Sequence, residues 1–229
     1  MIGVYDYTVI LTYLSLVSAM CGCIVSTAGN GHPYIGGFFL LFCGLCDTFD
    51  GKVARAKKNR TDREKAFGVQ IDSLADLVAF GVLPATIAVG LLTSDGVPII
   101  PFPEDRLVDL YMIGFLVIVI LYVLAALIRL AYFNVLDEEK RWAGDTCSKG
   151  YVGLPVTAAA LIFPVTLLMN YFIPKDLSQL YMVLLVVTGF LFLGRFRVKK
   201  PGKRLLTALL IAGGAEFVLL LLMLLYPAR

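Results

Sequence analysis

The sequence predicts an all-α integral membrane protein, a polytopic bundle of about six to eight transmembrane helices. Two observations lead to this fold class. Hydrophobic residues make up 59% of the 229 residues and the mean hydropathy is +0.84, which is more apolar surface than a soluble domain of this length carries. The apolar residues also gather in stretches of about 20 residues, the length that crosses a bilayer. We expect residues 1–229 to form a single membrane domain.

Seven candidate spans follow one another along the chain, separated by polar or turn-rich breaks. Gly29–Pro33 predicts a tight turn between the first two spans, residues 93–106 are rich in proline and acidic residues, and Ile173–Asp176 is a short loop. The seventh span could instead be re-entrant or lie along the membrane surface. The expected spans are residues 6–28, 34–54, 69–92, 110–133, 152–172, 179–194 and 205–226.

Basic residues are distributed unevenly between the two sides of these spans. Seven Lys or Arg residues lie in 52–65, three in 140–149 and six in 195–204, and all three segments share one side if every span crosses once. Sixteen basic residues on that side face three on the other. Because loops rich in Lys and Arg stay inside, we expect a multi-pass protein of the cytoplasmic membrane with these loops in the cytoplasm.

Four aspartates lie at the predicted cytoplasmic ends of the second and third spans. Asp47 and Asp50 are three residues apart, and Asp72 and Asp76 are four apart, so each pair shares one helix face. Two adjacent antiparallel helices can bring the four carboxylates together, where they repel one another unless a cation compensates. Carboxylates without histidine favour Mg²⁺ or Mn²⁺, and two such ions suit a diphosphate substrate. A single helix-end aspartate, in contrast, is ordinarily a solvated cap.

Small and basic residues surround the aspartates on the same helix faces. Gly51 and Ala54 leave a patch without bulky side chains, where a base or a phosphate could approach the helix. Arg55 can donate two hydrogen bonds to one phosphate. Gly68 lies one turn before Asp72 and clears space for a ligand. Taken alone, a glycine in a membrane helix ordinarily serves helix packing.

These residues together resemble the signature of the CDP-alcohol phosphatidyltransferase family, and all eight signature positions match. The resemblance implies that the first three aspartates and part of the fourth hold two metal ions, that the fourth takes the proton of the acceptor hydroxyl, and that the small residues and the arginine bind the CDP-lipid. It also implies a cavity open to the cytoplasm and a homodimer. The matching positions are Asp47, Asp50, Gly51, Ala54, Arg55, Gly68, Asp72 and Asp76.

One departure from the family pattern lies between the two halves of the signature. Twelve residues separate Arg55 from Gly68, which is more than the family usually has. The extra residues fall in the basic loop Lys57–Ala66, where Thr61 is a candidate contact for a substrate phosphate.

Flanking residues narrow the acceptor alcohol. The segments 72–81, 129–134 and 151–155 resemble the phosphatidylserine synthase branch, which implies transfer from CDP-diacylglycerol to L-serine. Arg129, near the cytoplasmic end of the fourth span, needs an anionic partner at that depth. We expect it to bind the serine carboxylate together with Asn134 and Lys149. The alternative is that Arg129 extends to the membrane interface or binds a lipid phosphate.

Two other functions stay open from the sequence. Glycerol-3-phosphate or an inositol phosphate could replace serine as the acceptor. A cation or metabolite transporter could also use intramembrane carboxylates, although transport sites usually lie near the midplane. Thr12, Ser15 and Ser18, three residues apart in the first span, could line the nucleotide pocket or simply pack. The expected partners are the substrates and the lipid bilayer, and no nucleic acid.

Overall fold

The computed structural model describes residues 3, 6–28, 32–57, 59–94, 106–143, 150–172, 178–199, 211–219 and 221–222. The predicted helical bundle is confirmed, with two short strands that the sequence did not predict. Residues 211–219 and 221–222 are also helical. The other elements are η1 (Tyr7–Val9), α1 (Ile10–Thr27), α2 (Pro33–Ala56), α3 (Asp62–Asp76), η2 (Leu77–Val82), α4 (Leu83–Ser94), α5 (Arg106–Ala143), β1 (Gly150–Val152), η3 (Val156–Ala158), α6 (Ala159–Phe172), α7 (Ser178–Leu193) and β2 (Arg197–Lys199).

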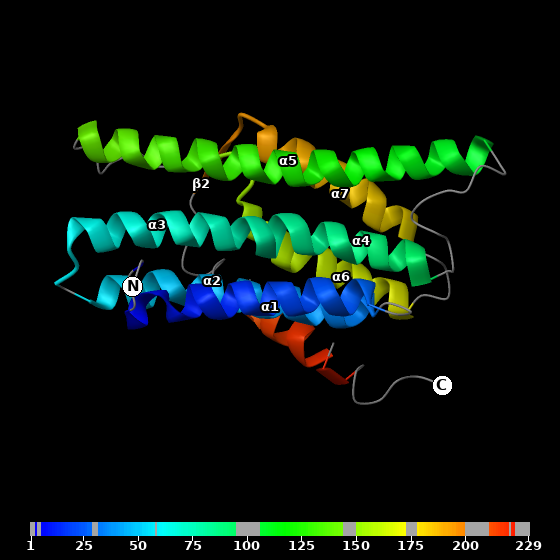
Figure 1. Ribbon diagram of the computed structural model, residues 1–229, viewed down its shortest axis with the longest axis horizontal. Coiled ribbons are helices and arrows are strands. Elements are labelled where there is room, and N and C mark those ends of the chain that lie inside the picture. The colour runs from blue at the N-terminus through cyan, green and yellow to red at the C-terminus, as the bar shows by residue number, and fades with distance from the viewer. Residues whose placement is uncertain are drawn as a thin grey trace.

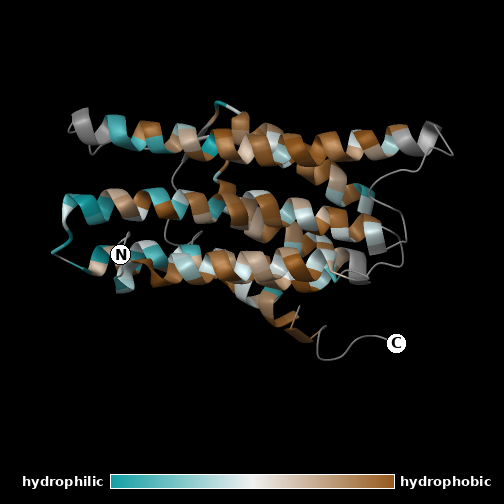
Figure 2. Cartoon of the chain, viewed as in Figure 1, coloured by the Kyte–Doolittle hydropathy of each residue, from teal (hydrophilic) through white to brown (hydrophobic). Residues whose placement is uncertain are grey.

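The long helices run side by side along one axis of the molecule. Figure 1 shows α1, the continuous rod of α3, η2 and α4, and α5 lying lengthwise, with α6 and α7 packed behind them. The helix pair α1 and α2 makes extensive contact, as does the pair α5 and α7. Hydrophilic residues gather at one end of the bundle, around the α2–α3 connection and the last turns of α5 (Figure 2). The rest of the bundle is mostly apolar.

Three helices of the described part of the chain are long and apolar enough to cross a membrane. They cover Tyr7–Thr27, Asp62–Thr93 and Leu110–Glu139, and the apolar helices Val156–Met169 and Ser178–Leu193 are shorter. Large apolar side chains point outward from these helices, for example Ile120, which is 63% exposed. A bundle that exposes such residues suits lipid rather than water, so the chain is a membrane protein. The predicted span 34–54 corresponds to α2, which is more polar. The predicted span 205–226 corresponds, over its described part, to the terminal helix.

Pro84 shapes the middle of the continuous rod formed by α3, η2 and α4. Pro84 has no N–H to donate and its ring conflicts with the carbonyl of Phe80, one turn earlier. The helix widens into a π-helix over Leu77–Val82, and the Tyr122 hydroxyl of α5 donates to the Phe80 carbonyl oxygen over 2.8 Å. The Tyr181 hydroxyl of α7 donates to the Pro84 carbonyl oxygen over 3.1 Å. Both tyrosines therefore tie their helices to the backbone at this break.

We predict that Tyr122→Phe lowers the stability of the bundle by about 1 kcal/mol, because the Phe80 carbonyl loses its buried donor. Thermal unfolding of the purified protein in detergent measures this change. Tyr111→Phe, at a position 55% exposed on the same helix, is the control and should leave the unfolding temperature unchanged. Equal unfolding temperatures for Tyr122→Phe and the wild type would contradict the prediction.

Candidate functional site

Three of the four aspartates meet between α2 and α3. One carboxylate oxygen each of Asp47, Asp50 and Asp72 lies within 4.8 Å of the other two. Asp50 is only 8% exposed. Asp76 follows one turn along α3, is partly buried, and interacts electrostatically with the other three carboxylates. The sequence predicted that all four carboxylates converge; the structure brings three of them together, with Asp76 beside that cluster.

No described cation of the protein pairs with these carboxylates. Among the residues that the structure describes, no Lys or Arg nitrogen lies within 4.0 Å of Asp47, Asp50, Asp72 or Asp76. Removing three carboxylates from water beside one another is strongly unfavourable unless positive charge is supplied. A set of carboxylate oxygens at this spacing is the donor type that Mg²⁺ and Mn²⁺ prefer. The residues present therefore fit the expected divalent ions.

The start of α3 sets which residues face this cluster. The Glu64 backbone N–H donates to the Thr61 hydroxyl oxygen over 3.2 Å, and the Thr61 N–H donates to Glu64 Oε2 over 2.7 Å, forming a capping box. A helix begun at Asp62 then carries Gly68, Asp72 and Asp76 on one face, at spacings of four. The Thr61 hydroxyl already serves as the cap, and its predicted phosphate contact stays a prediction.

Each signature glycine lies under an arginine. A Cβ atom added to Gly51 would lie 3.2 Å from Arg55 Nη1, and one added to Gly68 would lie 2.6 Å from Arg60 Nη2. Ala54 is half-buried beside Arg55 on α2, whose last turns are exposed. The signature predicted Arg55 but not Arg60. The only signal for Arg60 in the sequence was its membership of the basic loop.

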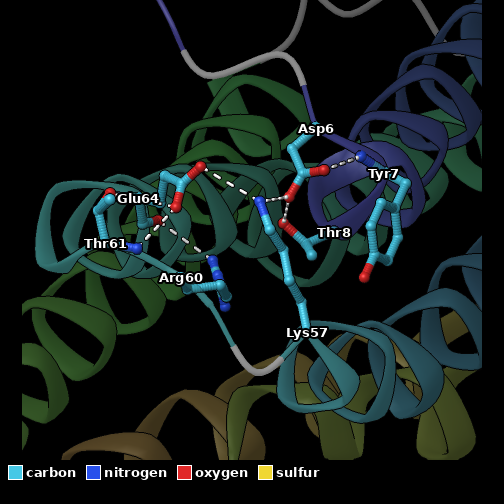
Figure 3. Close-up of polar contacts among 7 residues, drawn as sticks. All are labelled: Asp6, Tyr7, Thr8, Lys57, Arg60, Thr61 and Glu64. Atoms are coloured by element: carbon cyan, nitrogen blue, oxygen red, sulfur yellow. Dashed lines mark hydrogen bonds and ion pairs between the residues drawn. The ribbon is translucent and has the colours of Figure 1, made fainter.

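A three-residue ion-pair cluster fixes the loop between α2 and α3. Lys57 Nζ lies 2.9 Å from Asp6 Oδ2 and 3.2 Å from Glu64 Oε1, as Figure 3 shows. Asp6 also caps η1, because its Oδ1 accepts from the Tyr7 N–H over 2.8 Å. The segment before α1, the end of α2 and the start of α3 are thus joined at one point, which we call the Lys57 clasp. Sequence spacing gave no sign of it.

Arg129 is held in a frame made by two distant segments. Its side chain is 5% exposed, and its Nε donates to the Leu154 carbonyl oxygen over 3.2 Å. Gly153 has a φ of +77°, and its N–H donates to the Phe196 carbonyl oxygen over 2.6 Å. Strands β1 and β2 continue this pairing, with Tyr151 opposite Val198. No carboxylate among the described residues pairs with the guanidinium.

Contacts between α5 and the rod of α3, η2 and α4 indicate how far along the bundle Arg129 lies. The two run antiparallel (Figure 1), with the Ser73 hydroxyl donating to Asn134 Oδ1 over 3.0 Å and Tyr122 opposite Phe80. With equal rise along both helices, the Ser73 contact places Arg129 opposite residue 78 and the Phe80 contact places it opposite residue 73, so Arg129 lies within about one helix turn of the level of Asp76. Asn134 contacts Ser73, the residue that follows Asp72 in α3 and that the sequence analysis did not single out. The third predicted acceptor residue, Lys149, lies outside the described residues.

The polar face of α1 packs against α2. Thr12, Ser15 and Ser18 are all buried. The Ser18 hydroxyl donates to the Phe39 carbonyl oxygen over 3.3 Å, and the Cys43 thiol donates to the Ser15 carbonyl oxygen over 3.3 Å. These bonds account for Ser18 and Cys43 as packing residues between the two helices.

Comparison with known proteins agrees with this geometry. The profile of the CDP-alcohol phosphatidyltransferase family matches residues 8–192, a range that holds every predicted site residue. The chain belongs to the CDP-alcohol phosphatidyltransferase family. The resemblance inferred from the eight signature positions is therefore confirmed.

Several relatives carry the name of a serine-using enzyme. CDP-diacylglycerol–serine O-phosphatidyltransferase of Saccharomyces cerevisiae is 34% identical over 163 residues, covering 69% of this chain and 51% of that protein. The Helicobacter pylori (strain 26695) protein of that name is 29% identical over 67% of this chain and 55% of its own. Archaetidylserine synthase of Methanothermobacter thermautotrophicus is 29% identical over 76% and 63%. The chain spans about half the length of the first two relatives.

We predict that Asp47→Asn weakens Mn²⁺ binding on the order of tenfold to a hundredfold, because one of three converging carboxylates loses its charge. Titration of the purified protein with Mn²⁺, followed by electron paramagnetic resonance of the free ion, measures the affinity. The control is Asp62→Asn, whose exposed side chain pairs with Lys65 on the same helix. If both variants bind Mn²⁺ like the wild type, the cluster is not a metal site.

The Lys57 clasp should be insensitive to pH over a wide range. The hydrogen bond from Lys57 lowers the pKa of Asp6 from its ordinary value of 3.8, and the hydrogen bond to Asp6 raises the pKa of Lys57 from 10.5. The pKa of Glu64 is likewise lowered from 4.5, first by the Thr61 N–H and then by Lys57. A lowered acid pKa gives stabilisation that is lost only as pH falls below the ordinary value, here 4.5 for Glu64, and a raised lysine pKa gives stabilisation that is lost only above 10.5. We predict a constant difference in unfolding temperature between the wild type and Lys57→Met between these limits. A difference that vanishes near neutral pH would contradict this prediction.

Proposed function

We propose that the protein transfers the phosphatidyl group of CDP-diacylglycerol to the hydroxyl of L-serine, giving phosphatidylserine and CMP. The observation that carries the choice of serine is the buried guanidinium of Arg129, which lies within about one helix turn of the level of Asp76. It has no carboxylate partner among the described residues. A buried arginine without an anion is unfavourable, and the carboxylate of serine would complete the pair. The relatives that use serine support the same acceptor.

The site residues divide the reaction between them. Asp47, Asp50, Asp72 and part of Asp76 would hold two divalent ions, which would supply positive charge to polarise the phosphate and stabilise the departing CMP. Asp76 accepts the proton of the serine hydroxyl, whose oxygen then attacks the β-phosphorus in line. The new P–O bond forms as the bond to the CMP oxygen breaks, so no covalent enzyme intermediate is required.

The remaining signature residues bind the CDP-lipid. Gly51 and Ala54 leave room for the nucleotide and its phosphates against α2, Gly68 admits the side chain of Arg60 at the ligand-facing side of α3, and Arg55 donates to a phosphate oxygen. The basic loops put this end of the bundle on the cytoplasmic side, with the cavity open to the cytoplasm and to the inner leaflet. Residues 1–229 act as one membrane domain, and a homodimer is expected from the family resemblance.

Other acceptors would need more positive charge beside Asp76. Glycerol-3-phosphate and inositol phosphates carry a phosphate of about two negative charges, whereas the described acceptor site offers one arginine. Membership of the family favours group transfer over the transporter interpretation. The acceptor is therefore the part of the proposal that most needs a direct test.

The direct test is transfer of radiolabelled serine to CDP-diacylglycerol by the purified protein with Mn²⁺. We expect labelled phosphatidylserine and an equal amount of CMP, with no product from Asp76→Asn or after addition of a chelator. Parallel reactions contain labelled glycerol-3-phosphate or inositol phosphate. Product from one of these and none from serine would reassign the acceptor, and absence of CMP with every acceptor would refute the proposed transfer.

Arg129→Gln should raise the KM for serine about tenfold or more and leave the KM for CDP-diacylglycerol unchanged, because only the acceptor loses a charge-assisted hydrogen bond. Arg129→Lys keeps the charge, so its KM for serine should lie between those of the wild type and Arg129→Gln. Arg195→Gln, at an exposed position, is the control. An equal rise in both KM values would show that Arg129 supports the fold rather than the acceptor.

A further inference from the structure

The guanidinium of Arg60 occupies the space that Gly68 leaves open. Its Nη2 would lie 2.6 Å from a Cβ atom on Gly68, closer than any real side chain tolerates. Nη2 donates to the Glu64 carbonyl oxygen over 3.1 Å, whereas the Nε–H is buried and has no hydrogen-bond partner within the described part of the chain. A buried, unpaired N–H of a charged group is costly, which indicates that a ligand completes its bonding.

Glu64, whose backbone carbonyl accepts from Arg60, makes no ion pair with it, and both of its carboxylate oxygens already accept other hydrogen bonds. Glu64 Oε1 accepts from Lys57 Nζ over 3.2 Å, and Glu64 Oε2 accepts from the N–H and the hydroxyl of Thr61 over 2.7 and 3.1 Å. Figure 3 shows this arrangement, with Arg60 reaching only the backbone of the same turn. The Lys57 clasp and the capping box therefore keep the positive charge of Arg60 available.

Arg55 and Arg60 each cover a glycine of a helix that carries aspartates. Arg55, in the last turn of α2, covers Gly51, which directly follows Asp50. Arg60, in the connection before α3, covers Gly68, one turn before Asp72. Both guanidinium groups therefore lie at the aspartate-bearing ends of the two helices, so a ligand bound over the aspartates meets an arginine from each helix end.

We propose that Arg60 binds a phosphate of the CDP-lipid, opposite Arg55, and that Lys57 and Glu64 act as positioning residues that keep it free to do so. The inference rests on the proposed function, since it assumes a diphosphate substrate over the aspartates. A guanidinium suits this task because two of its N–H groups can bind one phosphate in a fixed geometry. The long basic loop thereby supplies a second cation that the eight signature positions do not contain.

The test compares KM values in mixed detergent micelles. Arg60→Gln should raise the KM for CDP-diacylglycerol about tenfold and leave the KM for serine unchanged, and Arg60→Lys should give a smaller rise. Arg63→Gln, at an exposed position of the same basic segment, is the matched control and should keep wild-type values. An unchanged KM for CDP-diacylglycerol in Arg60→Gln, or a fall in kcat alone, would overturn the proposal.

Binding of CDP to the purified protein, measured by calorimetry with Mn²⁺ present, separates this proposal from the proposed function. The proposal predicts weaker CDP binding by Arg60→Gln than by the wild type, and an intermediate affinity for Arg60→Lys. If the glutamine variant does not fold, the comparison of Arg60→Lys with the wild type replaces it. Equal CDP binding by the wild type and Arg60→Lys would count against Arg60 alone. Absence of CDP binding and of transfer in the wild type would instead refute the proposed function.

A second arm tests the positioning residues. Lys57→Met releases Glu64 Oε1, which can then pair with Arg60, so the KM for CDP-diacylglycerol should rise several-fold. Adding Glu64→Gln removes the competing charge while keeping a residue suited to the capping box, and should bring the KM back. If Lys57→Met leaves this KM unchanged, or if the double variant does not recover, Lys57 and Glu64 do not control Arg60.

Discussion

Three carboxylates that approach within 4.8 Å of one another at the end of a membrane bundle are the constraint on which the rest of the site depends. Their mutual repulsion opposes the close packing of α2 and α3. Several features of the described structure hold these helices together against that repulsion: the capping box that starts α3, the Lys57 clasp, and the contacts of both helices with α1. The protein provides the framework, and the carboxylate cluster is suited to divalent cations that would provide the missing charge.

Helical periodicity explains why so much of this site was predictable. Residues three or four apart share a helix face, as Asp47 and Asp50 do, and also Asp72 and Asp76. With the two helices adjacent, the sequence alone predicted that the pairs face each other. The role of Arg60 was not predictable in this way. It depends on which oxygen of Glu64 is occupied, and that depends on Lys57 and on Asp6, which is 51 residues away from Lys57 along the chain. Contacts of this range follow from tertiary packing and leave no periodic pattern.

The all-α prediction missed β1 and β2 for a related reason. Strands of three residues are too short to show the alternation that identifies a strand, and these two pair across more than forty residues of sequence. The left-handed backbone at Gly153 could not be predicted either, because a glycine in a loop can adopt many backbone conformations. The sequence pointed to Arg129 as a buried cation, but the frame that orients it became visible only in the structure.

That frame has a consequence for how the enzyme is made. The aspartates, Arg55 and Arg60 lie within residues 47–76, whereas the frame around Arg129 includes Phe196 and β2. During synthesis, the aspartates can therefore come together while Arg129 still lacks this last strand. A nascent chain that stops short of α7 would hold the aspartate cluster without a seated Arg129. The frame around Arg129 thus forms only when the bundle is nearly complete.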